Sequence, residues 1–184
     1  MTEQRPASIR IERALAATTE VRALVDELDH ELSQHYAAEQ RHGLSVEAIF
    51  QPHVRFFVAR LNGEAVGCGG VALFADFAEV KRMYVRDDAR GKGVAQALLA
   101  RIEMEVRAAR LAVLRLETGE RQEAAIRLYM RAGFRRPPAK RARRPSPRRA
   151  AEAGRWIGWP LPASPRCSVH GLARLFSAAA RRVF

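Results

Sequence analysis

The chain divides sharply in charge near residue 136, and this division confines a folded core to the residues before it. Residues 1–135 contain 20 Lys and Arg and 19 Asp and Glu, whereas residues 136–184 contain 12 Lys and Arg and a single acid, Glu152. Seven of the nine prolines lie in the same last 49 residues, where only eight residues are Leu, Ile, Val or Phe. So little apolar surface with so much net charge cannot offset the chain entropy lost on folding. We therefore expect a nearly neutral folded domain over 1–136 and a basic Pro/Arg/Ala-rich, disordered tail over 137–184.

The tail has two explanations that its residues leave open. Arg outnumbers Lys 29 to 3 in the whole chain, and Arg, Pro, Ala and Gly make up 31 of the last 49 residues. A GC-rich gene read in a shifted frame gives such a composition, and we favour a frameshift near codon 137. The alternative is a genuine basic extension that binds nucleic acid or an acidic partner by neutralising negative charges.

The overall composition is that of a globular protein with a core. The chain has 184 residues, 48% hydrophobic and 28% charged, which are ordinary values. No apolar run approaches the roughly 18 residues of a membrane span, and the first residues lack the apolar segment of a secretory signal. The two cysteines, Cys68 and Cys167, cannot form a disulfide framework and favour a reducing compartment. We expect a cytoplasmic protein without a membrane partner; its oligomeric state stays open.

Hydrophobic periodicity before residue 136 predicts a mixed α/β domain. The Asn62-Gly63 pair predicts a hairpin turn, and three glycines within the strand that follows it, Gly67, Gly69 and Gly70, indicate a bulge or a close neighbour. Expected strands are residues 9–12, 54–60, 64–74, 79–85 and 111–117, and expected helices are 18–32, a short one ending near 50, 91–110 and 121–132.

The link between the strand at 79–85 and the helix after it has the composition of an anion site. It reads Arg90-Gly91-Lys92-Gly93-Val94-Ala95. Small residues at such a turn let backbone N–H groups approach a phosphate, and a helix N-terminus adds free donors and partial positive charge. A dinucleotide-binding fingerprint requires a third small residue where Gln96 stands, and no Walker-type P-loop sequence is present.

The same residues, together with those that follow, resemble the GNAT N-acetyltransferase superfamily. Arg90, Gly93 and Ala95 match its acetyl-CoA motif Q/R-x-x-G-x-G/A, and the segment from Leu128 to Phe134, LYMRAGF, matches its LYxxxGF ending. The resemblance covers residues 8–135 in element order and is sharp over 79–134. It implies a GNAT acyltransferase fold, a mixed and mostly antiparallel sheet flanked by helices. Because proline removes donors from strand ladders, we expect the C-terminal strands of that fold to be missing or replaced here.

The resemblance also implies which residues bind acetyl-CoA as a co-substrate. The strand end at Met83, Tyr84 and Val85 would bind the pantetheine arm through its backbone. Gln122 stands where many members have an asparagine that contacts the cofactor, and would make that contact here. The pyrophosphate would lie on Arg90, Gly91, Lys92, Gly93, Val94 and Ala95.

Two residues are candidates for moving protons in acetyl transfer. Tyr129 lies where many members have a tyrosine that protonates the departing thiolate; the alternative is a core aromatic beside Ile126 and Leu128. Glu79 opens the strand at 79–85, where some members have a glutamate that accepts the proton of the amine directly or through water. Its alternative is a solvated glutamate, with ordered water as the base.

The acceptor is the least constrained part of this hypothesis. We expect a small-molecule or protein amine to bind around residues 36–50. The five histidines lack metal-ligand spacing, so no metal is expected. Besides an acetyl-CoA-dependent N-acetyltransferase, the residues leave open a GNAT-fold protein that binds acetyl-CoA without turnover, and a nucleic-acid-binding module that uses the tail.

Overall fold

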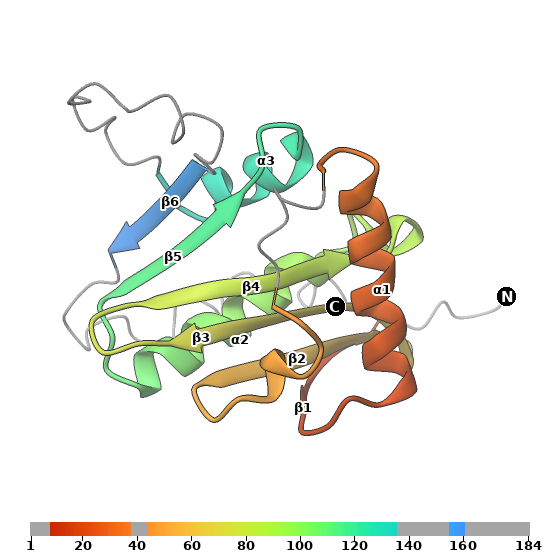
Figure 1. Ribbon diagram of the computed structural model, residues 1–184, viewed down its shortest axis with the longest axis horizontal. Helices are drawn as coiled ribbons and strands as arrows, with labels where there is room; N and C mark the ends of the chain where they lie inside the picture. Colours follow the sequence, from red (N-terminus) through yellow and green to blue (C-terminus); the bar gives the residue numbers. More distant parts are fainter. Residues whose placement is uncertain (1–7, 38–43, 136–154, 161–184) are drawn as a thin grey trace, which may run out of the picture.

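A computed structural model of the chain describes residues 8–37, 44–135 and 155–160. In this part helices cover both faces of one six-stranded sheet (Figure 1). Neighbouring strands are antiparallel except β4 and β5, which are parallel. The predicted mixed, mostly antiparallel sheet flanked by helices is therefore confirmed. In sheet order the strands are β1 (Ile9–Ala14), β2 (Val54–Leu61), β3 (Glu64–Leu73), β4 (Ala78–Val85), β5 (Val113–Thr118) and β6 (Arg155–Pro160).

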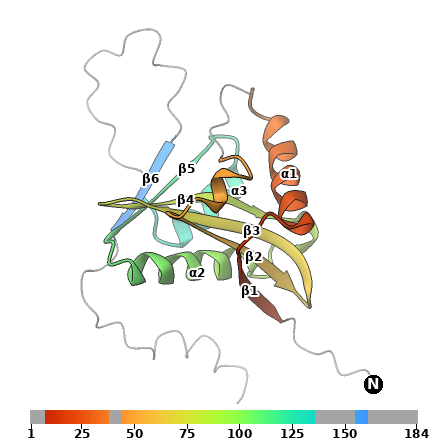
Figure 2. The same cartoon turned by 60° about the horizontal axis from the view of Figure 1, so that its bottom comes forward.

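The helices divide between the two faces of the sheet. α1 (Thr19–Ser33) lies on one face and α2 (Val94–Ala108) on the other (Figure 2). α3 (Glu123–Arg131) packs into the same apolar cluster as α2 through Leu128 and Tyr129. Two short 3₁₀ segments, η2 (Ala48–Phe50) and η3 (Asp87–Ala89), precede β2 and α2.

Each face has its own core because the apolar residues of each helix recur at helical spacing. On the α1 side, Val21, Leu24 and Val25 pack against side chains of β2 and β3. Thr18 begins this helix by accepting a hydrogen bond from the Val21 N–H at 3.3 Å, which satisfies one free donor of the first turn. On the α2 side, Leu98 and Ile102 lie in the larger cluster, together with inward residues of all strands from β2 to β5.

The glycines of β3 allow close approach of its neighbours, as the sequence predicts. A Cβ atom at Gly67 would lie 2.7 Å from the carbonyl oxygen of Tyr84 in β4. A Cβ atom at Gly70 would lie 2.9 Å from the carbonyl oxygen of Arg55 in β2. The strand is thus pressed from both sides by backbone, which confirms the predicted close neighbours, whereas the register shift between Cys68 and Gly70 places the extra residue of the bulge in β4.

Most element boundaries differ from expectation by one or two residues, but α2 begins at Val94 rather than at residue 91. Gly91 and Gly93 have φ values of 76° and 87°, which belong to left-handed turn conformations and not to an α-helix. The two glycines therefore lie in the link that leads into the helix. This difference matters because it places the helix N-terminus after the glycines.

β6 departs from our expectation for residues 137–184. All six of its residues pair antiparallel with β5, from Arg155 opposite Thr118 to Pro160 opposite Val113. We expected most of this segment to be disordered, but residues 155–160 form a strand, in which RWIGWP contains two tryptophans and an isoleucine that favour strands. Its proline stands at the last position, where a missing donor interrupts the ladder least. The rest of the tail lies outside the described residues.

The pairing of β6 leads to a prediction about shortened chains. Ending the chain after Arg135 should lower the free energy of unfolding by about 1–6 kcal/mol, because six cross-strand pairs are lost at roughly 0.2–1 kcal/mol each. Ending it after Pro160 keeps these pairs and should leave stability unchanged. Urea unfolding of the two shortened proteins and the full chain measures the difference. Equal stability of all three would show that β6 contributes nothing, whereas loss of stability after Pro160 would show that the later residues belong to the folded unit.

Candidate active site

The site begins where two parallel strands separate. β4 and β5 pair only from Ala78 opposite Leu114 to Val80 opposite Leu116. Beyond Val80, β4 continues to Val85 without a partner on the β5 side among the described residues. Backbone groups along this edge are free to pair with an extended ligand, in the manner of an added strand.

A bulge in β4 lies at the start of this opening. Gly67 pairs with Val85, Cys68 with Tyr84 and Gly70 with Lys81. Gly69 is therefore opposite two residues, Arg82 and Met83. Arg82 has a φ of 55°, and a bulge of this kind changes the direction of the backbone groups that follow it.

The link from β4 to α2 leaves the first turn of that helix open. Gly93 is the N-cap of α2, in a left-handed conformation and without any side-chain cap. A Cβ atom at Gly91 would meet nothing within 4 Å, so the loop is open on that side. Uncapped N–H groups at a helix N-terminus attract an anion. This geometry fits a pyrophosphate at the predicted residues.

The two basic side chains of this link, Arg90 and Lys92, differ in their contacts with the rest of the protein. The Arg90 guanidinium is held by the chain itself: Nη2 lies 2.7 Å from Glu31, Nη1 lies 2.7 Å from Asp87, and Nε donates to the Val85 carbonyl at 2.9 Å. Lys92 is exposed and forms no ion pair with another described residue. Lys92, rather than Arg90, is thus the cation available to an incoming phosphate.

The strand end predicted to bind pantetheine is partly occupied. The Val85 carbonyl already accepts a hydrogen bond from Arg90, which leaves the backbone of Met83 and Tyr84 along the open edge. The side chain of Tyr84 lies on the α1 side, in contact with the smaller core. Burial and the neighbouring Glu27 carboxylate raise the pKa of Tyr84 to about 12, so its hydroxyl stays protonated at neutral pH.

Gln122 holds the loop between β5 and α3. Its Oε1 accepts hydrogen bonds from the Thr118 hydroxyl at 3.0 Å and from the Gly119 N–H at 3.1 Å. Because a backbone N–H can only donate, the atom that faces it is the amide oxygen. The side-chain oxygen of Gln122 is thus engaged within the protein.

Tyr129 lies in the core of the α2 side, 6% exposed. Its ring packs edge-to-face on Phe134, with 5.7 Å between centroids. It shares the apolar cluster with Val85 and Val94, which flank the phosphate loop. Burial raises the pKa of Tyr129, because desolvation disfavours the phenolate. The phenol of Tyr129 therefore keeps its proton at neutral pH.

Glu79 is buried at 5% exposure, two residues before the strands separate. Its Oε1 lies 2.8 Å from Lys81 Nζ, but this approach lacks hydrogen-bond angles, and Oε1 has no hydrogen-bond partner among the described residues. Arg115 lies opposite Glu79 in the β4–β5 register. The alternative of a fully solvated glutamate does not hold, since this carboxylate is enclosed by the sheet and its neighbours.

The region predicted to bind the acceptor is described in part. Residues 38–43, including Glu39, lie outside the described part of the chain, and Glu47 is exposed. The hydroxyl of Tyr36 accepts a hydrogen bond from the Arg121 N–H at 3.0 Å, so the segment after α1 contacts the loop before α3. This contact places the residues after α1 beside the end of β5, at the open end of the separated strands.

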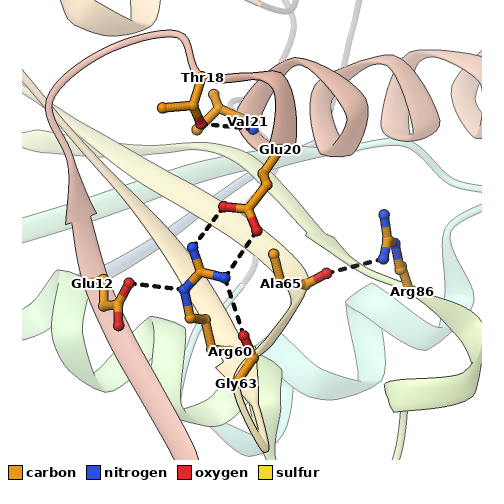
Figure 3. Close-up of polar contacts among 8 residues, drawn as sticks. All are labelled: Glu12, Thr18, Glu20, Val21, Arg60, Gly63, Ala65 and Arg86. Atoms are coloured by element: carbon orange, nitrogen blue, oxygen red, sulfur yellow. Dashed lines mark hydrogen bonds and ion pairs between the residues drawn. The ribbon is translucent and has the colours of Figure 1, made fainter.

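A cavity of about 230 Å³ lies away from this opening, between the start of α1 and the β2–β3 hairpin. It is lined by Thr19, Glu20, Glu64 and Arg86, among others. Beside it, Arg60 binds Glu20 and Glu12, and Arg86 donates to the Ala65 carbonyl (Figure 3). Hydrogen bonding from Arg60 lowers the pKa of Glu20. The charged side chains that line this cavity, Glu20, Glu64 and Arg86, each already form an ion pair within the protein.

No group of three or more His, Cys, Asp or Glu side chains is placed to hold a metal ion within 8–37, 44–135 and 155–160. No helix in these same segments is long and apolar enough to cross a membrane.

Comparison with known proteins identifies the class that this fold and site define. The profile of the acetyltransferase (GNAT) family matches residues 19–134. An IAA acetyltransferase of Azospirillum brasilense is 46% identical over 113 residues, which cover 60% of this chain and 74% of that protein. The chain belongs to the GNAT acetyltransferase family.

Solved structures agree with this assignment at the level of the fold. A GNAT-family acetyltransferase of Staphylococcus aureus Mu50 has a TM-score of 0.65 at 20% identity, over 84% of this chain and 100% of that one. The PaiA N-acetyltransferase of Thermoplasma acidophilum, solved with coenzyme A, has a TM-score of 0.63 at 15% identity, over 83% and 99% of the two chains.

One residue that the sequence reasoning missed is Arg82. Its side chain is 7% exposed and binds Asp29 of α1 and the carbonyl of Leu44. The signal was present, because an arginine inside a strand with apolar neighbours is expensive to bury without partners. The positive φ that places it at the bulge had no counterpart in the sequence, since glycine is the usual residue there.

Proposed function

We propose that this chain transfers an acetyl group from acetyl-CoA to an amine of a small molecule or protein. The observation that carries the proposal is the separation of β4 and β5 after Val80, on the strand whose end leads through residues 86–93 to the uncapped N-terminus of α2. One surface thus offers strand-edge backbone groups for an extended arm and helix-terminal donors for a pyrophosphate. The 46% identity to an IAA acetyltransferase supports acetyl transfer as the reaction.

In this proposal the chain binds acetyl-CoA chiefly through its backbone. The backbone of Met83 and Tyr84 binds the pantetheine arm. The backbone of residues 91–95 binds the pyrophosphate, and the side chain of Lys92 adds a positive charge there. Arg90 acts indirectly by holding the Val85 carbonyl and Glu31. Gln122 shapes the loop at the end of β5 instead of offering its oxygen to the cofactor.

The reaction needs one proton removed and one supplied. The amine nitrogen attacks the thioester carbonyl carbon, the C–N bond forms, and the C–S bond breaks to release the thiolate of CoA. Glu79 takes the proton of the amine directly or through water, and Tyr129 gives its proton to the thiolate. A backbone N–H near the β4 bulge stabilises the oxyanion that develops on the carbonyl oxygen.

Two other functions stay open as outcomes of the test. A protein that binds acetyl-CoA without turnover would bind it but release no thiol with any amine. Nucleic-acid binding by the basic tail rests on residues outside the described part, apart from 155–160, so it remains a prediction from charge alone.

Thiol release from acetyl-CoA with a panel of amines tests the proposal. We expect Glu79→Gln to lower kcat by about 100-fold or more, the usual contribution of a general base, while the Kd for acetyl-CoA stays unchanged. Glu117→Gln, on the neighbouring strand β5, is the matched control and should keep wild-type kcat. Wild-type turnover in Glu79→Gln would leave water as the base.

A further inference from the structure

The bulge of β4 is built on an arginine in an unfavourable backbone conformation. Arg82 has a φ of 55°, and a left-handed conformation is unfavourable for a residue with a side chain. Glycine would meet the same backbone requirement without that cost. The Arg82 side chain must therefore contribute something that glycine lacks.

The contacts of this side chain join three parts of the protein. Arg82 Nε donates to the Leu44 carbonyl at 2.6 Å, and Nη1 forms an ion pair with Asp29 of α1. The Arg82 carbonyl lies at 3.5 Å from the Cys68 Sγ of β3. A planar guanidinium donates in two directions at once, which a lysine ammonium on a flexible stem does less well. We call this set of Arg82, Asp29 and Leu44 the bulge clamp.

The bulge is also held from the opposite face of the sheet. The Met83 side chain passes so close over Gly69 that a Cβ atom there would overlap its Sδ, and Ile102 of α2 lies within 3.8 Å of the same point. Successive residues of the bulge are thus anchored to opposite sides, Arg82 toward α1 and Met83 toward α2. The backbone that follows, at Met83 and Tyr84, is the open edge described above.

We propose that Arg82 is a positioning residue, which fixes the β4 bulge so that the backbone of Met83 and Tyr84 presents its hydrogen-bonding groups to the thioester. The inference rests on the proposed function, because it assigns a task to the same open edge. It goes further because it links that edge to Leu44. Leu44 lies in the segment 36–50, where we expect the acceptor to bind.

Arg82→Gly removes the bulge clamp but allows the same backbone conformation, because glycine has no side chain and adopts the positive φ freely. We expect kcat to fall by about 10- to 100-fold, in line with the cost of misplacing reacting groups by about 1 Å. The Kd for acetyl-CoA should change less than threefold, because the phosphate loop is untouched. Arg82→Lys and Asp29→Asn keep part of the clamp and should give intermediate kcat values.

Arg60→Gly is the matched control. Arg60 also ties α1 to the sheet, through Glu20 and Glu12 (Figure 3), but lies far from the bulge in sequence and strand. Glycine in β2 should lower thermal stability, while kcat stays unchanged. Equal effects of the two variants on kcat, or wild-type kcat in Arg82→Gly, would overturn the proposal.

Amide hydrogen exchange gives a readout that does not depend on turnover. In Arg82→Gly we expect faster exchange at residues 82–85 and unchanged exchange at 56–59, whereas Arg60→Gly should leave 82–85 protected. If the wild type shows no acetyl transfer but the exchange pattern holds, the proposed function fails and the clamp stands. Unchanged protection at 82–85 in Arg82→Gly would overturn the clamp even in an active enzyme.

Discussion

Gly93→Glu should weaken acetyl-CoA binding by about 100-fold or more, which corresponds to about 2.7 kcal/mol. Gly93 caps α2 at a φ of 87° without a side-chain cap, where the free N–H groups of the first turn attract an anion. A glutamate there strains the backbone and brings a carboxylate to the place of the pyrophosphate. Isothermal titration calorimetry with acetyl-CoA measures the loss.

Gly93→Gln is the control for this prediction, because glutamine has the same size and the same unfavourable backbone conformation but no charge. It should bind acetyl-CoA more weakly than the wild type and more tightly than Gly93→Glu, and added salt should narrow the gap between the two variants. Wild-type affinity in a folded Gly93→Glu protein would remove the α2 N-terminus from the cofactor site.

Tyr129→Phe should lower kcat by about 100-fold or more, the scale of a lost general acid, with little change in acetyl-CoA affinity. The ring remains to pack on Phe134, so stability should change little, as circular dichroism melts can verify. Because burial raises the pKa of Tyr129, its phenol is protonated throughout the neutral range. The ratio of wild-type to variant kcat should therefore be constant between about pH 6 and pH 9.

Two results would speak against this role of Tyr129. An unchanged kcat at every pH would make it a packing residue and leave solvent as the proton donor. A kcat loss accompanied by an equal loss of thermal stability would point to a disturbed core, since Tyr129 belongs to the apolar cluster of the α2 side.

The order of elements up to residue 135 could be predicted because local signals agree there with the tertiary structure. The apolar spacing of α1, the Asn62-Gly63 turn and the glycines of β3 each correspond to an observed feature. β6 was missed because composition was averaged over the whole tail, and the average concealed six residues with strand propensity. Pairing with β5 depends on a partner distant in sequence, which no local pattern shows.

The candidate site was predictable in its loop and less so in its side chains. Gly91 and Gly93 predict an open turn, whereas no local sequence pattern predicts that Arg90 binds Glu31, which is 59 residues away. The engagement of Gln122 Oε1 by Gly119 and the pairing of Glu79 with Lys81 also depend on how the chain folds back on itself. Such contacts determine which side chains of the predicted motif are already engaged within the protein.

The central claim is that the open edge of β4 and the α2 N-terminus serve acetyl transfer to an amine. Incubating the full chain with acetyl-CoA labelled in its acetyl group and with an amine panel tests it directly, with mass spectrometry of the amines as the readout. We predict that the label appears on the nitrogen of at least one amine, in proportion to the free thiol of CoA released. Label that stays on CoA, or appears as free acetate independently of any amine, would contradict the claim.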